Sequence, residues 1–113
     1  MKRIYYLSTC STCKRILKDL GERAEDFELI DIKPNPLTEE QVEKLRKMTD
    51  SYESLFSKTA RKYQDLGLKE KNLQEEDFKH YLLEHYTFLK RPVLIDGDDI
   101  YIGSRSVQKY IDA

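Results

Sequence analysis

The sequence is poor in residues that build covalent or metal-centred frameworks, and it has no long apolar run. Tryptophan is absent, and the 113 residues include only two cysteines, two histidines, three prolines and four glycines. Two cysteines are too few for a four-thiolate zinc site within one chain or for a disulfide-stapled fold. No stretch approaches the roughly eighteen apolar residues of a membrane span, and polar Ser8 follows too early for a secretory leader. We therefore expect a cytoplasmic protein with no membrane segment.

An excess of charge of one sign is also missing. Lys and Arg number 20 against 21 Asp and Glu, which leaves a formal net charge of −1. This balance lacks the basic excess of a general nucleic-acid binder, so we expect no direct binding to nucleic acid. Hydrophobic residues make up 39% of the chain, enough for one core at this length. We predict a single domain spanning residues 1–113.

The first third of the chain carries strand and helix patterns in turn. Residues 2–7 form a β-branched and aromatic run, and a stripe of apolar side chains then recurs at helical spacing up to Leu20. Gly21 is expected to end this helix. Residues 27–32 predict a second strand, closed by a proline-rich loop. The order β-α-β predicts two parallel strands joined by a crossover helix.

The middle of the chain is predicted to be helical throughout. Thr38 and Gln41 fit a capping box that starts one helix. Short helical segments are expected within residues 52–66, and the acid-rich start of residues 74–85 predicts a further helix. These segments together form a predicted all-helical insert over about residues 38–88.

A β-hairpin and a helix are predicted to end the chain. Pro92 opens an apolar strand, an Asp-Gly turn follows at residues 96–97, and residues 100–103 form the returning strand. Ser104 or Ser106 is expected to cap the last helix. The whole order is β-α-β, a helical insert, then β-β-α. This α/β order resembles a thioredoxin-type mixed sheet interrupted by helices.

Cys10 and Cys13 lie where the first strand leads into the first helix. A helix N-terminus stabilises negative charge and lowers the pKa of a cysteine below its free value of about 8.5. We predict that Cys10 is the exposed nucleophile and Cys13 the more sheltered resolving thiol, at a spacing that allows a disulfide. The same amides can bind an oxyanion, which makes Ser11, Thr12 and Lys14 candidate substrate-binding residues.

Two other interpretations of the cysteine pair stay open. The pair could form half of a zinc site shared across a dimer, or it could be two unrelated core cysteines. A metal site within one chain needs two more ligands, and His80 and His85 lie about 140° apart around a helix. We therefore predict no metal site, and we expect both histidines at the helix surface or half-buried.

Arg91 and Pro92 are the second feature with chemical meaning. Pro92 either simply ends the preceding loop or, as in a thioredoxin-type sheet, follows a cis peptide bond and faces the active cysteine. In the second case Arg91 would reach an anion or a thiolate at Cys10. We therefore count Arg91 as a candidate catalytic residue and Pro92 as part of the candidate substrate site.

Three segments give the chain a resemblance to a known family. They are residues 8–15 (Ser-Thr-Cys-Ser-Thr-Cys-Lys-Arg), residues 57–68, and residues 88–95 followed by residues 100–103. In these segments, and over nearly its whole length, the chain resembles the ArsC/Spx family. This family contains glutaredoxin-linked arsenate reductases and the Spx transcription regulators. The resemblance implies a thioredoxin-like fold with a helical insert.

The resemblance implies a thiol-dependent oxidoreductase, an enzyme of the arsenate-reductase type. In those reductases a cysteine attacks arsenate, glutathione resolves the thiol–arsenate adduct, and glutaredoxin restores the enzyme. The matching residues here are Cys10 as the nucleophile and Arg91 as the oxyanion-binding arginine. We expect no bound cofactor, glutathione or another thiol as reductant, glutaredoxin or thioredoxin as partner, and a small oxyanion or thiol as substrate.

The sequence departs from the arsenate reductases at two arginines. One of them falls at Ser57, with Lys58 and Arg61 nearby, and the last falls near residues 102–103, with Arg105 close by. The substrate therefore stays open, and another electrophile such as a disulfide or a sulfenate is an alternative to arsenate.

The second cysteine is more like the Spx branch, in which the pair is a disulfide switch. Cys13 thus supports an alternative function, a redox-switched transcription regulator that binds the RNA polymerase α-subunit. Residues 49–52 lack the glycine that Spx presents to the C-terminal domain of that subunit. An enzyme is our first hypothesis and a regulator is our second.

Overall fold

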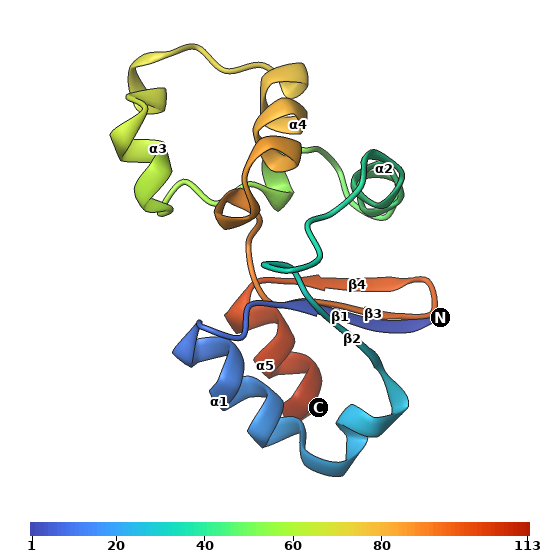
Figure 1. Cartoon of the computed structure of the whole chain (residues 1–113). Coiled ribbons are helices and arrows are strands. Elements are labelled where there is room, and N and C mark those ends of the chain that lie inside the picture. The colour runs from blue at the N-terminus through green and yellow to red at the C-terminus, as the bar shows by residue number, and fades with distance from the viewer. The chain divides into compact units, whose positions relative to one another are not determined.

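The chain divides into two compact units in the computed structural model, which describes residues 1–113 (Figure 1). The first unit combines residues 1–35 with residues 91–113, and the second is residues 36–90. The second unit corresponds to the helical insert that the sequence places over about residues 38–88. The organisation of the whole chain as a single domain stays a prediction.

The first unit carries the sheet. Its four strands lie in the order β2-β1-β3-β4, with β1 parallel to β2 and antiparallel to β3, and β3 antiparallel to β4. The predicted α/β class, with β-α-β before the insert and β-β-α after it, is confirmed. The elements are β1 (Lys2–Tyr6), α1 (Ser11–Leu20), the 3-10 helix η1 (Gly21–Asp26), β2 (Glu28–Asp31), β3 (Val93–Asp96), β4 (Asp99–Ile102) and α5 (Ser104–Asp112).

One apolar cluster joins the sheet to α1 and α5, which lie side by side on one face of it (Figure 1). Apolar residues three or four positions apart on each helix share the face that meets the strands. Cys13 lies in the buried stripe of α1 with 0% of its surface exposed, whereas Leu17 is only half-buried. The buried members of the cluster are Ile4, Ile16, Leu20, Phe27, Leu94, Val107 and Ile111.

Glycines with positive φ set two chain reversals in the first unit. Gly97 has a φ of 62° in the two-residue turn between β3 and β4, which is the predicted Asp-Gly hairpin turn. Gly103 has a φ of 88° and is itself the N-cap of α5, where no side chain caps the helix. The predicted cap at Ser104 or Ser106 is therefore wrong. Glycine adopts this φ without a Cβ clash, so the helix starts early and both serines lie inside it.

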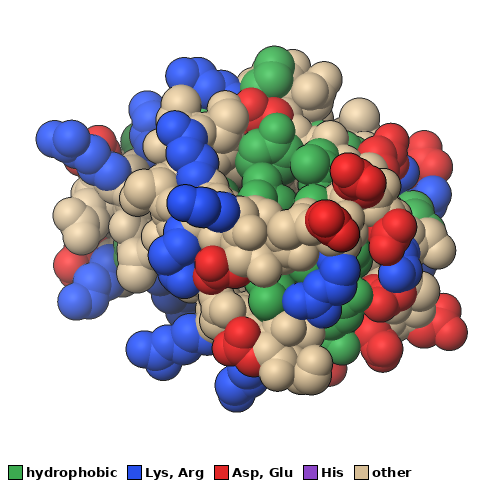
Figure 2. All heavy atoms as spheres, turned by 90° about the horizontal axis from the view of Figure 1, so that it is seen from below, with side chains coloured by type: hydrophobic (Ala, Val, Ile, Leu, Met, Phe, Trp, Pro, Cys, Tyr) green, Lys and Arg blue, Asp and Glu red, His purple; other side chains and the backbone are tan.

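The surface of the first unit is divided by charge although the net charge of the chain is −1. The helix α1 exposes three basic side chains, and η1 exposes three acidic ones. Figure 2 shows one face on which basic side chains gather on one side and acidic side chains on the other. The surface of α1, the helix that begins after Cys10, therefore carries an excess of positive charge.

The second unit is helical, as predicted. Thr38 caps α2 with a capping box, because its hydroxyl accepts from the Gln41 amide (3.2 Å) and its amide donates to the Gln41 side chain (2.9 Å). No helix in the chain has the length and the apolar character needed to cross a membrane. The elements are α2 (Glu39–Lys47), α3 (Arg61–Asp65), α4 (Glu75–Glu84) and the 3-10 helices η2 (Glu53–Leu55), η3 (Leu68–Glu70) and η4 (Tyr86–Phe88).

Phe56 is the centre of an aromatic core in the second unit. Its ring stacks on Phe88 with ring centroids 5.0 Å apart and an angle of 17°. The Phe78 ring meets it at 5.0 Å and the Tyr63 ring at 5.9 Å, both in edge-on geometry. Phe56 is 1% exposed, whereas Leu66, which follows α3, is 45% exposed. Short helices pack around these rings in place of a long amphipathic helix.

Candidate functional site

Cys10 is the residue that precedes α1 and acts as its N-cap. Its backbone is extended, with φ −90° and ψ 116°, and its side chain is partly exposed. The Cys10 amide donates to the Leu7 carbonyl (3.0 Å), and the Lys14 amide donates to the Cys10 carbonyl (3.1 Å). This turn places the thiol at the end of a helix whose first amides have no partner within the helix.

Cys13 lies one helical turn beyond Cys10, and the two residues are 3.6 Å apart. Both are free cysteines, and Cys13 has 0% of its surface exposed. The predicted contrast between an accessible Cys10 and a sheltered Cys13 matches this placement. Their chemical roles, and the formation of a disulfide between them, stay predictions.

The pKa of the Cys10 thiol is lowered from its ordinary value. Burial raises this pKa, but four other groups together lower it by more. They are the Cys13 amide, the Cys13 thiol, the Thr12 amide and the positively charged Arg91. The Cys10 side chain accepts no cap hydrogen bond of standard geometry. The amides of Thr12 and Cys13 nevertheless lie near enough to stabilise its thiolate. Cys10 is therefore the thiol of the pair that ionises more readily.

Burial raises the pKa of the Cys13 thiol to about 11. A backbone hydrogen bond from Leu7 and the positive charge of Arg91 act in the opposite direction, but the hydrogen bond that Cys13 donates to Cys10 and the negative charge on Cys10 add to the rise. Cys13 therefore stays a protonated thiol at neutral pH and donates a hydrogen bond to the Cys10 thiolate. One shared proton stabilises the pair.

Arg91 and Pro92 precede β3 and belong to the same unit as the cysteines. The Arg91–Pro92 peptide bond is cis, as expected for a proline at this place in a thioredoxin-type sheet. Arg91 is half-buried and Pro92 is buried. The positive charge of Arg91 acts on both thiols and lowers the pKa of each. The structure thus brings Arg91 to the cysteine pair.

The other predicted oxyanion-binding residues divide into two groups. Thr12 contributes its amide to the site, where it favours the Cys10 thiolate. Ser11 and Lys14 are exposed, and their side chains make no hydrogen bond or ion pair within the protein. A role for Ser11, Thr12, Lys14 and Pro92 in holding a substrate oxyanion stays a prediction.

Asp31, which carries no functional motif in the sequence, accepts a hydrogen bond from the loop that leads to Cys10. Its Oδ1 accepts from the Ser8 amide (3.4 Å) and from the Lys33 amide (3.3 Å). A hydrogen bond from the Ser8 side chain, these amides and the Lys33 charge lower the pKa of Asp31. The sequence offers one signal for this contact, an acidic residue at the end of the second strand. Parallel strands end at the same edge of a sheet, so this residue lies near the end of the first strand.

The two histidines take ordinary positions in the second unit. His80 is exposed, and its Nε2 lies 2.7 Å from Glu84 Oε2 on the same helix. His85 is half-buried, and its Nδ1 lies 2.8 Å from the Thr87 hydroxyl. No group of three or more His, Cys, Asp or Glu side chains lies close enough together to hold a metal ion.

Curated relatives of the chain include a reductase and a regulator. The protein YusI of Bacillus subtilis (strain 168) is 27% identical over 107 residues, which cover 92% of this chain and 91% of that protein. Global transcriptional regulator Spx 2 of Bacillus anthracis is 22% identical over 111 residues, 96% of this chain and 85% of the regulator. Arsenate reductase of Yersinia enterocolitica is 27% identical over 93 residues, 81% of this chain and 66% of the reductase.

Solved structures and a family model agree on the fold. The crystal structure of a possible arsenate reductase from Streptococcus mutans UA159 matches with a TM-score of 0.78 and 29% identity, over 100% of this chain and 98% of that one. The fold is thioredoxin-like, as predicted. The model of the ArsC family matches residues 5–109, a span that contains Cys10, Cys13 and Arg91. The chain belongs to the ArsC family.

Proposed function

We propose that this protein is a thiol-dependent oxidoreductase that reduces a small oxyanion, with arsenate as the first substrate to test. One observation carries the proposal. A helix-capping Cys10 with a lowered pKa lies 3.6 Å from a buried, protonated Cys13. Membership of the ArsC family and the match to a reductase named for arsenate support the choice of substrate.

In the first step the Cys10 thiolate attacks the arsenic atom of arsenate. A sulfur–arsenic bond forms, and one arsenate oxygen leaves as water after it takes up protons. The remaining oxygens stay negatively charged. The free amides at the start of α1 and the positive charge of Arg91 are suited to stabilising that charge.

In the second step the Cys13 sulfur attacks the Cys10 sulfur. The sulfur–sulfur bond forms, the sulfur–arsenic bond breaks, and its electron pair stays on arsenic, so arsenate is reduced to arsenite while two thiols are oxidised to a disulfide. Loss of the negative charge on Cys10 in the adduct removes one cause of the raised pKa of Cys13. Cys13 therefore becomes easier to deprotonate when its attack is required.

A reducing partner then completes the cycle. A dithiol protein such as glutaredoxin or thioredoxin, or glutathione, attacks the disulfide and restores both thiols by thiol–disulfide exchange. The two electrons that reduce arsenic thus come from the external thiol. This sequence of steps needs no bound cofactor.

Arsenate reduction coupled to glutaredoxin or thioredoxin tests the proposal. We expect turnover in the wild type, none in Cys10→Ser, and a strong loss in Arg91→Met. Lys18→Met, which removes a positive charge from an exposed position on α1, is the matched control and should retain activity. Activity that survives in Cys10→Ser would contradict the proposal, as would a wild type that reduces neither arsenate nor another small oxyanion.

The match to Spx 2 over 96% of the chain favours a second candidate function, a redox-switched regulator. In that case oxidation of Cys10 and Cys13 would change the affinity of the protein for the RNA polymerase α-subunit. Binding of the purified C-terminal domain of that subunit to the oxidised form but not to the reduced form would favour the regulator. Equal absence of binding in both forms, together with measurable turnover, would favour the enzyme.

A further inference from the structure

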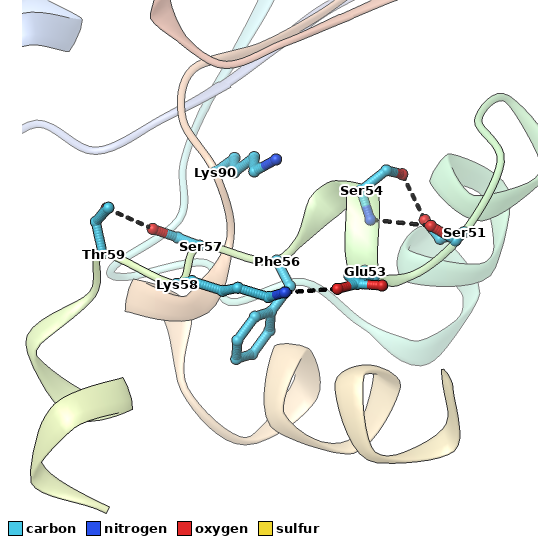
Figure 3. A pocket seen from close by; sticks show the side chains of 8 residues that line it. All are labelled: Ser51, Glu53, Ser54, Phe56, Ser57, Lys58, Thr59 and Lys90. Atoms are coloured by element: carbon cyan, nitrogen blue, oxygen red, sulfur yellow. Dashed lines mark hydrogen bonds and ion pairs between the residues drawn. The ribbon is translucent and has the colours of Figure 1, made fainter. Parts of the chain in front are cut away.

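The helical second unit holds a cavity of about 520 Å³ lined mainly by polar side chains (Figure 3). Four hydroxyl side chains, two lysines, one glutamate and one phenylalanine form its lining. A volume between roughly 300 and 1,000 Å³ is typical of sites for small molecules. The proposed oxidoreductase chemistry uses none of these residues.

Backbone hydrogen bonds fix the wall that carries Ser57 and Lys90. The Ser57 amide donates to the Phe88 carbonyl (2.6 Å), and the Lys90 amide donates to the Leu55 carbonyl (2.8 Å). Phe56, between these bonds, is 1% exposed in the aromatic core. These bonds hold one wall of the cavity in place, which lowers the entropy cost of binding a ligand there.

Lys90 gives the cavity a positive charge that no acidic side chain balances. The Nζ of Lys58 lies 2.6 Å from Glu53 Oε2, so this pair is neutral overall. Lys90 forms no ion pair within 4.0 Å. In Figure 3 its side chain lies near Ser57, and its nitrogen is directed toward the side of Ser54. A negatively charged group would supply the missing partner.

Hydroxyl protons are available around this lysine. The Ser54 hydroxyl donates to the Ser51 carbonyl (2.6 Å), whereas the Ser51 hydroxyl accepts from the Ser54 amide (3.1 Å) and keeps its own proton. The hydroxyls of Ser57 and Thr59 lie 3.1 Å apart, and one of the two protons remains free. At least two hydroxyl donors can therefore point to a ligand beside the ammonium of Lys90.

Positive charge continues beyond this cavity. Lys58 also lines two further cavities of about 330 and 260 Å³, and these add Lys69 and Lys71. Glu53 is the only acidic residue in the lining of the three cavities. Such an excess of one sign in recessed surface raises the local concentration of ligands of the opposite sign.

We propose that this cavity binds a small molecule that carries a phosphate group. Lys90 pairs with the phosphate, and the hydroxyls of Ser51 and of the Ser57–Thr59 pair donate to its oxygens. Lysine is a common point-charge partner of phosphate, and a tetrahedral oxyanion accepts several hydrogen bonds at once. The lysines of the two further cavities favour a ligand with more than one negative charge.

NMR titration of the protein with inorganic phosphate and with pyrophosphate tests this site, with chloride holding the ionic strength constant. The Cys10→Ser variant is used throughout, so a failure here is distinct from a failure of the proposed reaction. We expect saturable shifts at the amides of residues 51–59 and 90, and tighter binding of pyrophosphate. Lys90→Met should weaken binding about tenfold, because it removes a charge-assisted hydrogen bond.

Lys47→Met is the matched control, since Lys47 is an exposed lysine at the end of α2 outside the cavity lining. It should leave the affinity for phosphate unchanged, and Ser51→Ala should reduce that affinity a few-fold. Unchanged thermal unfolding of Lys90→Met would show that the variant folds. Shifts that do not saturate, or equal affinities of Lys90→Met and Lys47→Met, would overturn the proposal.

Discussion

Cys10 and Cys13 lie 3.6 Å apart, yet the fold pushes the pKa values of their thiols in opposite directions. Cys10 is the N-cap residue of α1 and its side chain is partly exposed, whereas Cys13 is fully buried one turn later. The buried Cys13 thiol donates a hydrogen bond to the partly exposed Cys10 thiolate. Both cysteines are free, with no disulfide between them.

Loss of the Arg91 charge should raise the pKa of Cys10. The positive charge of Arg91 is one of the causes that lower this pKa, so Arg91→Met removes stabilisation from the thiolate. We expect the thiolate absorbance of a Cys13→Ser, Arg91→Met double variant to appear at higher pH than that of Cys13→Ser alone. Arg91→Lys keeps the charge and should restore most of the difference. An unchanged titration would show that Arg91 does not act on the thiol.

Protonation of Cys13 should contribute to stability at neutral pH and cease to do so in alkali. Burial raises the pKa of this thiol to about 11, so the folded state favours the neutral form. The contribution is full below pH 9 and is lost as the pH rises through 11. The free energy of unfolding of the wild type should therefore fall by about 2 kcal/mol more than that of Cys13→Ala over this range. Parallel pH curves from urea titrations of the two proteins would contradict the assignment.

Truncation of Phe56 should destabilise the helical unit strongly. Three aromatic rings surround this side chain within 5.9 Å, and Phe56→Ala leaves a cavity among them. We expect a loss of about 3–5 kcal/mol in the free energy of unfolding. Leu66→Ala is the control, because Leu66 is 45% exposed and its truncation should cost less than about 0.5 kcal/mol. Comparable losses from both variants, measured by denaturant unfolding, would contradict the position of Phe56 at the centre of the aromatic core.

Removal of the Thr38 cap should weaken the start of α2. Thr38→Ala leaves the Gln41 amide without its partner and should cost about 1 kcal/mol. Thr9→Ala changes the same side chain at an exposed position with no cap role, and should have little effect on stability. Thermal unfolding followed by circular dichroism measures both. A Thr38→Ala variant as stable as Thr9→Ala would exclude a stabilising capping box.

Much of the fold follows from local sequence signals. The capping box at Thr38, the Asp-Gly turn at Gly97 and the apolar spacing of α1 each act over a few residues, and each appears where it is predicted. Signals of this kind depend on backbone geometry and side-chain period, which the sequence displays directly.

Features that depend on contacts between distant segments were harder to predict. Asp31, at the end of β2, accepts a hydrogen bond from the Ser8 amide, which follows the parallel strand β1. The local sequence around neither residue predicts that bond. The cap at Gly103 depends on how β4 leaves the sheet. The cavity beside Lys90 exists because two segments far apart in the sequence pair near Phe56, as the bridge from Phe56 to Leu89 shows. Cys10, Cys13 and Arg91 were identified by position and resemblance, but their electrostatic coupling required the folded chain.

The rates at which iodoacetamide alkylates the two cysteines test the central claim most directly. The wild-type protein is reacted at a series of pH values, and peptide mass spectrometry follows Cys10 and Cys13 separately. We predict that Cys10 reacts at least about tenfold faster at neutral pH, because the buried Cys13 with a pKa of about 11 holds a far smaller thiolate fraction. The rate for Cys10 should also rise with a midpoint below that of an ordinary cysteine thiol. Equal rates, faster labelling of Cys13, or an ordinary thiol profile for Cys10 would contradict the account.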